Sequence, residues 1–197
     1  MKIIVFSSSK FAFLYLKESF NDKQLNTITL ITDQLTDELE KFLNSKNIKF
    51  IVTKNLTLKT LNQIDLNNCL VLSAGSPWIF REALINKLGK NFYNIHQSPL
   101  PSMKGSVASY IIMYDIRSFQ VCLHKVTAGI DSGKIIYRKN IFIPSSLKTP
   151  FDVNEFLQRM NRVMLKEFLT KFEKEEIMEE ESQNSFFSSY NSRLSSQ

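Results

Sequence analysis

Short apolar runs alternate with segments of helical spacing along the first half of the chain. Four runs are predicted strands because they are short, apolar or β-branched, and bounded by polar residues: KIIVF at 2–6, NTITLIT at 26–32, KFIV at 49–52 and CLVLS at 69–73. The segments between them carry apolar residues at intervals of three and four. Strands that alternate with helices predict an α/β fold, a Rossmann-like open and mostly parallel sheet with helices on both faces.

The second half of the chain changes pattern. FQVCLHKV at 119–126 and KIIYRKNIFI at 134–143 flank the turn sequence TAGIDSG, which predicts an antiparallel hairpin. Pro150 and Asp152 then open a long predicted helix. From residue 173 the charge run EKEEIMEEE and a Ser-rich end follow. We therefore expect one domain over 1–172 and a tail over 173–197. The tail reads as frayed helix and disorder, or as a segment that needs absent neighbours.

Ligands of open parallel sheets bind beyond the carboxyl ends of the strands. This rule selects three loops, at 7–10, 73–80 and 94–105. The first loop reads SSSK and contains no glycine, so a helix N-cap is favoured there over a phosphate cradle.

The third loop begins with Asn94 and His96, which project to the same side of an extended strand. A hydrogen-bonded histidine at a strand edge would explain His96 without any function. The following SPLPSMKG loop favours a ligand site, because its two prolines fix the backbone and Gly105 permits a sharp turn.

Asp131 follows His96 by 35 residues and lies in the predicted hairpin turn. It either stabilises its own turn or faces His96 and raises the basicity of the imidazole. His124, the second of two histidines, is expected to be a packed or surface residue.

Composition narrows the classes of protein. The chain has 197 residues, 43% of them hydrophobic, which suffices for a packed core. No apolar run reaches the length of about 18 residues that a membrane span needs. Neither cysteine has metal-ligand spacing, so we expect reduced thiols, no metal and a cytoplasmic location. The net charge of +6 is scattered, which suits an anionic small substrate and does not indicate nucleic-acid binding.

The pattern N-x-H-x-S-x-L-P-x-x-x-G at 94–105, with G-I-D-S-G at 129–133, resembles the N10-formyltetrahydrofolate-dependent formyltransferase family. That family includes glycinamide ribonucleotide, methionyl-tRNA and sugar N-formyltransferases. The resemblance covers roughly residues 1–172 and implies one-carbon transfer, with Asn94, His96 and Asp131 as catalytic residues. Pro99, Gln97 and Lys104 depart from the usual residues of the family loop.

The resemblance also implies where the co-substrate 10-formyltetrahydrofolate binds. The implied folate residues belong to two segments: Pro77, Trp78, Ile79 and Phe80 in one, and Ala128, Gly129 and Ile130 in the other. Ser9, Gln97 and Lys104 are the implied contacts of the acceptor substrate. The alternative for the Trp78–Phe80 stretch is an ordinary place in the hydrophobic core.

The chemistry needs a neutral amine, a stabilised oxyanion and a proton for the leaving nitrogen, which an Asn, a His and an Asp can supply. Within the family, the first loop lacks the glycines of the ribonucleotide enzymes, and a 197-residue chain leaves no room for the extra C-terminal domain of the tRNA enzymes. A nucleotide-linked amino sugar is therefore the expected acceptor. The alternatives are a formyl-folate hydrolase, a methionyl-tRNA formyltransferase-like protein and an inactive folate- or nucleotide-binding module. The sequence does not determine which sugar is the acceptor, whether the protein forms a homodimer, or whether the C-terminus is truncated.

Overall fold

The structure is a computed structural model that describes residues 1–105, 107–176, 178–184 and 190–191. Its seven-stranded sheet has the strand order β3-β2-β1-β4-β5-β7-β8. The chain divides into two compact units, Met1–Asn94 with Lys125–Ala128, and Ile95–His124 with Gly129–Gln197. We describe each unit in turn.

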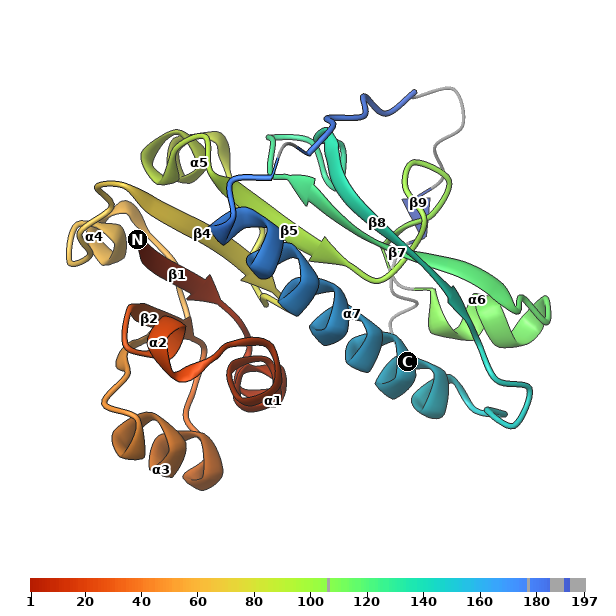
Figure 1. Ribbon diagram of the computed structural model, residues 1–197, viewed down its shortest axis with the longest axis horizontal. Helices are drawn as coiled ribbons and strands as arrows, with labels where there is room; N and C mark the ends of the chain where they lie inside the picture. Colours follow the sequence, from red (N-terminus) through yellow and green to blue (C-terminus); the bar gives the residue numbers. More distant parts are fainter. Residues whose placement is uncertain (106, 177, 185–189, 192–197) are drawn as a thin grey trace. The chain divides into compact units, whose positions relative to one another are not determined.

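Four strands of the first unit pair in parallel, with helices between them in the chain (Figure 1). They are β1 (Lys2–Phe6), β2 (Ile28–Thr32), β3 (Lys49–Val52) and β4 (Cys69–Ala74). The helices are α1 (Ser9–Ser19), α2 (Asp22–Leu25), α3 (Asp37–Ser45), α4 (Leu58–Leu61) and α5 (Glu82–Leu88). The mostly parallel α/β sheet predicted from the sequence is confirmed.

The central strands of this unit are mostly apolar, and they are largely buried. Every residue of β4 is buried, as expected for a parallel strand covered on both faces. Phe6, Phe80 and Phe92 form an edge-packed aromatic group, with ring centroids 5.1 Å apart for Phe6 and Phe80 and 4.8 Å apart for Phe80 and Phe92. Phe80 is 9% exposed and belongs to the core of the first unit.

The polar–apolar spacing after β2 predicts a helix that begins at Asp33, but the helix starts later. It begins at Asp37, because Thr36 is the N-cap and its hydroxyl accepts a hydrogen bond from the Leu39 amide. Asp33 lies before this helix and accepts a hydrogen bond from the Ser9 amide instead.

The second unit contains the predicted hairpin and long helix. β5 (Phe92–His96) enters this unit at Ile95, and β7 (Ser118–Lys125) pairs antiparallel with β8 (Ile135–Phe142). The remaining elements are β6 (Lys104–Gly105), α6 (Ala108–Met113), α7 (Pro150–Glu173) and β9 (Tyr190–Asn191), which pairs with β6. Helix α7 starts with the Thr149 hydroxyl as its cap and buries a stripe that runs from Val153 to Leu169. No helix in the described ranges has the length and apolar character to cross a bilayer.

The segment that follows α7 corrects one expectation. Glu181 and Ile135 exchange two backbone hydrogen bonds of 2.8 Å, so the chain returns to β8 after the helix ends. Two of the acidic residues beyond the helix pair with cations, Glu180 with Lys134 and Glu181 with Arg138. Disorder was therefore the wrong expectation for residues 178–184. Residues 185–189 and 192–197, where the rest of that prediction falls, lie outside the described residues, and the 172/173 domain boundary remains a prediction.

Candidate active site

His96 is the last residue of β5, and its imidazole lies in a buried polar network. Its Nε2 is 2.6 Å from the Ser98 hydroxyl and 3.2 Å from the Met103 carbonyl oxygen. The Ser98 hydroxyl also donates a hydrogen bond to that carbonyl. Because Ser98 and Met103 both belong to the proline-containing loop after β5, the loop holds one side of the ring in place.

Asp131 meets the other side of the ring. Its Oδ2 lies 3.6 Å from Nδ1 of His96, and its side chain is only 14% exposed. The backbone of Asp131 is in the left-handed region, with φ of 47°, which aspartate tolerates better than most residues. His96 and Asp131, one from each of the two motifs found in the sequence, thus meet in the second unit.

Each protonation state of His96 satisfies this network to a different degree. An Nε2–H donates toward Ser98 and Met103 while the Ser98 hydroxyl donates to the Met103 carbonyl. With Nδ1 unprotonated, however, its lone pair faces the Asp131 carboxylate. An Nδ1–H points its positive end at the Asp131 carboxylate and lets Ser98 donate to Nε2, but the Met103 carbonyl then loses its donor. Only the doubly protonated ring supplies a proton to every contact.

Burial opposes that charged form. The pKa of His96 is lowered from 6.5, first because burial penalises the imidazolium, while the Asp131 charge and the Met103 carbonyl act in the opposite direction. His96 is therefore a neutral ring at neutral pH, and its hydrogen-bond partners are arranged to accept it as a cation. This combination suits a group that takes up and returns a proton during a reaction.

His124 is the residue that the sequence analysis missed. It is 2% exposed, and its Nε2 lies 3.5 Å from Oδ1 of Asp131, so one carboxylate faces both histidines. The rings of His96 and His124 are edge to face, with centroids 6.1 Å apart. The available signal was the position of His124 near the end of the predicted strand, seven residues before Asp131.

The other predicted polar residues have mixed positions. Asn94 is half-buried and lies two residues before His96 on β5. Gln97 accepts a hydrogen bond of 3.0 Å from Gln158 of α7, and Lys104 lies in β6. Ser9 is buried, and its amide donates to Oδ1 of Asp33 at 2.8 Å.

The predicted folate residues belong to both units and differ in exposure. Phe80 is a core residue, whereas Ile79 is 75% exposed. Trp78 is half-buried against Phe6, and its indole N–H donates to the Lys54 carbonyl at 3.1 Å. For Phe80 the structure therefore supports a place in the core, and it leaves Trp78 and Ile79 accessible to a ligand.

The other folate residues and Pro77 are exposed. Pro77, Ala128 and Gly129 lie at the surface of their own units, and Ile130 is 48% exposed. A Cβ at position 129 would overlap the Ser132 hydroxyl, which would then have to move.

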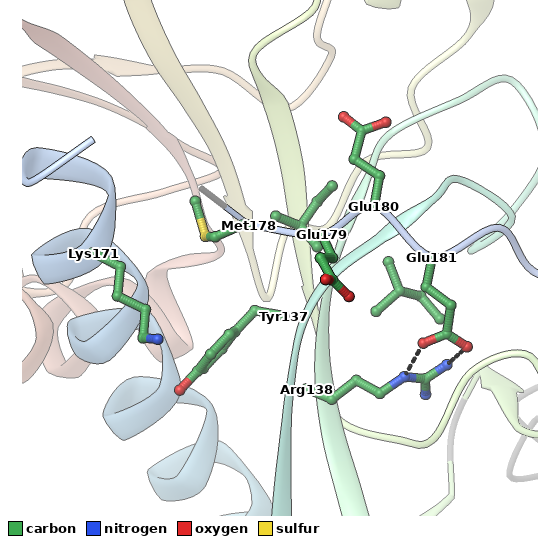
Figure 2. Close-up of a pocket in the computed structure, with 9 residues that line it drawn as sticks. Tyr137, Arg138, Lys171, Met178, Glu179, Glu180 and Glu181 are labelled. Atoms are coloured by element: carbon green, nitrogen blue, oxygen red, sulfur yellow. Dashed lines mark hydrogen bonds and ion pairs between the residues drawn. The ribbon is translucent and has the colours of Figure 1, made fainter. Parts of the chain in front are cut away.

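A cavity of about 490 Å³ lies in another part of the second unit (Figure 2). Residues from β8, Lys171 of α7 and the segment 178–181 line it. Neither His96 nor Asp131 is among the lining residues. Within the described residues, no cluster of His, Cys, Asp or Glu has the arrangement of a metal site.

No protein-family model matches the chain. By sequence it is 28% identical over 185 residues to the methionyl-tRNA formyltransferase of Borreliella afzelii (strain PKo), a match that covers 88% of this chain and 58% of that protein. The chain therefore spans less than two thirds of the length of this relative.

Two solved structures show the same fold. One is an N-formyltransferase from Helicobacter canadensis in complex with folinic acid and dTDP-3-aminofucose. It has a TM-score of 0.75 and 21% identity, over 98% of this chain and 71% of that one. The other is a glycinamide ribonucleotide transformylase from Symbiobacterium toebii, with a TM-score of 0.72 and 16% identity, over 93% of this chain and 94% of that one.

Proposed function

We propose, from the premise that this chain has the fold and the sequence motifs of the formyltransferase family, that it transfers a formyl group from 10-formyltetrahydrofolate to a primary amine. The acceptor in this proposal is an amino sugar linked to a nucleotide. The observation that carries the proposal is the contact between His96 and Asp131, because it joins the two motifs on which the resemblance depends.

The co-substrate supplies an activated formyl group, whose carbon forms a bond to the amine nitrogen and loses its bond to N10. One proton must leave the amine and one must reach N10. In the proposal, His96 and Asp131 take the proton from the amine and deliver a proton to N10, which contributes a factor of about 10²–10⁴ to the rate. The Asn94 amide donates to the oxyanion, a role worth about 10²–10³.

The helix start after β1 does not leave the amide of Ser9 free to bind a phosphate. A free helix N-terminus attracts phosphate through its amides and its dipole. Here the Ser9 amide already donates to the Asp33 carboxylate, so a negative charge occupies that position. The N-formyltransferase with dTDP-3-aminofucose agrees with a sugar acceptor, but the ribonucleotide enzyme has the same fold, so the fold alone does not choose between them.

The test incubates the full chain with 10-formyltetrahydrofolate and follows folate absorbance with a dTDP-amino sugar, with methionyl-tRNA, or with neither. Turnover that depends on the sugar supports the proposal. Turnover with the tRNA alone, or without any amine, assigns the chain to the alternative acceptor or to a hydrolase. Folate binding without turnover identifies an inactive binding module.

The matched variant is His96→Gln, which keeps a polar side chain of similar size. We expect its kcat to fall by about 10²–10⁴, with an unchanged circular dichroism spectrum. Ser146→Ala, an exposed change in the same unit, serves as the control. Near-normal turnover of His96→Gln would refute the assigned role. The cytoplasmic location and the homodimer remain predictions.

A further inference from the structure

The turn that carries Asp131 is held from outside by a residue far along the chain. The side-chain amide nitrogen of Gln183 donates to the backbone carbonyls of Asp131, at 2.9 Å, and Gly133, at 2.7 Å. These two carbonyls bracket the part of the turn in which Asp131 has its left-handed backbone. Within the turn itself, the Ser132 hydroxyl donates to the Gly129 carbonyl.

The orientation of the Gln183 amide follows from its partners. Both contacts are carbonyl oxygens, which only accept, so the nitrogen must face them. The amide oxygen is then buried, and it has no hydrogen-bond partner among the residues that the structure describes. An unpaired buried oxygen is unfavourable, which indicates that the two bonds to the turn determine the position of this side chain.

Gln183 belongs to a short segment, residues 178–184, that is anchored on β8. We call it the C-terminal segment. Glu181 accepts two hydrogen bonds from the Arg138 guanidinium, from Nε at 2.9 Å and from Nη2 at 2.8 Å (Figure 2). Backbone hydrogen bonds between Glu181 and Ile135 hold the same point. Gln183 follows Glu181 by two residues, so these contacts of Glu181 with β8 limit where the Gln183 side chain can lie.

The same anchor reaches the loop on the other side of His96. Nη1 of Arg138 donates to the Leu100 carbonyl at 2.7 Å, within the loop that also carries Ser98. The C-terminal segment is thus bonded to the Asp131 turn directly and to the His96 loop through Arg138. It therefore has hydrogen-bonded contacts on both sides of the His96 and Asp131 pair.

We propose that Gln183 is a positioning residue for Asp131, which fixes the turn so that its carboxylate faces His96. The catalytic consequence rests on the proposed formyl transfer, whereas the structural consequence does not. No sequence motif includes Gln183, and the segment around it reads as a polar tail.

The test is a double-mutant cycle between Gln183→Met and Asp131→Asn. Methionine has a similar length and no donor, and asparagine removes the charge while tolerating the left-handed backbone. The chain has two histidines, so the His96 ring protons can be followed by NMR over pH in the free protein. The charged or titratable groups that act on His96 are Asp131, His124 and Lys104.

We expect Gln183→Met to move the His96 titration midpoint to lower pH when Asp131 is present, because the carboxylate that favours the imidazolium is no longer held. In the Asp131→Asn background the same change should have no effect. With substrates, kcat/KM should fall by up to about 10²-fold in the first background and not in the second. Gln63→Met, an exposed Gln outside this region, is the control.

An equal midpoint shift in both backgrounds, or none with Asp131 present, would overturn the inference. If Gln183→Met does not fold, Gln183→Asn replaces it, since its shorter amide cannot bridge both carbonyls and must give the same result. The titration needs no substrate. Absence of turnover in every protein would refute the proposed function and leave the titration to decide on Gln183.

Discussion

Replacing Arg138 by methionine tests how the C-terminal segment contributes to stability. Arg138 makes two kinds of contact, an ion pair with Glu181 and hydrogen bonds from Nη1 to the Leu100 carbonyl, the Gln120 amide oxygen and the Cys122 sulfur. The ion pair is at the surface, since the Glu181 side chain is 59% exposed. Leu100 is only 2% exposed and forms a small core with Cys122 and Ile135.

The two contacts differ in expected magnitude. Arg138 lowers the pKa of Glu181 through their hydrogen bonds, but an exposed pair of this kind contributes only about 0.2–1 kcal/mol. A buried carbonyl that loses its donor costs about 1–3 kcal/mol. Arg138→Met should therefore reduce the free energy of unfolding by about 1–4 kcal/mol. Glu181→Gln, which leaves the Arg138 bond to Leu100 intact, should reduce it by less than about 1 kcal/mol.

The assay is urea unfolding followed by circular dichroism, with linear extrapolation to zero denaturant. A repeat in 1 M salt separates the two contributions, because salt screens the exposed pair and does not restore the lost donor. The Glu181→Gln difference should shrink in salt, and the Arg138→Met difference should persist. Equal losses for the two variants, or an Arg138→Met loss that salt abolishes, would show that the ion pair and not the Leu100 bond stabilises this region.

Three further predictions concern the core and the candidate site. Phe80→Ala should lower the free energy of unfolding, measured in urea, by about 3–5 kcal/mol, whereas Ile79→Ala, at an exposed position, should lower it by less than about 0.5 kcal/mol. Similar losses for the two variants would contradict the core assignment of Phe80. If folate binds against Trp78, the only tryptophan, saturating 10-formyltetrahydrofolate should change its fluorescence; an unchanged spectrum where calorimetry shows binding argues against contact. Burial holds the pKa of His96 below 6.5, so the unfolded chain binds the proton more readily than the folded chain does. The free energy of unfolding should therefore fall as the pH drops from 7 to 5, and it should fall more than that of His96→Gln. Parallel pH profiles of the two proteins would rule this out.

Local patterns were sufficient for the elements and for the two motifs of the site. The apolar runs at β1, β2 and β4 predict buried parallel strands because a strand covered on both faces has no polar side. The turn chemistry of TAGIDSG predicts the hairpin, and the strand-end position of His96 predicts its place at a site. These features depend on residues close together in the sequence, so local patterns are enough to predict them.

Tertiary structure alone decided which partners the site residues have. His124 looked like an ordinary strand residue, and only the register of the hairpin shows that it faces Asp131. The polar tail looked unstructured because no periodicity marks it, yet Gln183 reaches a turn that precedes it by about fifty residues. Such contacts come from single side chains that meet after the chain returns on itself. The sequence by itself determined the strands, the hairpin and the site motifs. What holds Asp131 in place was decided only by the folded chain, because one amide or carboxylate leaves no repeating pattern in the sequence.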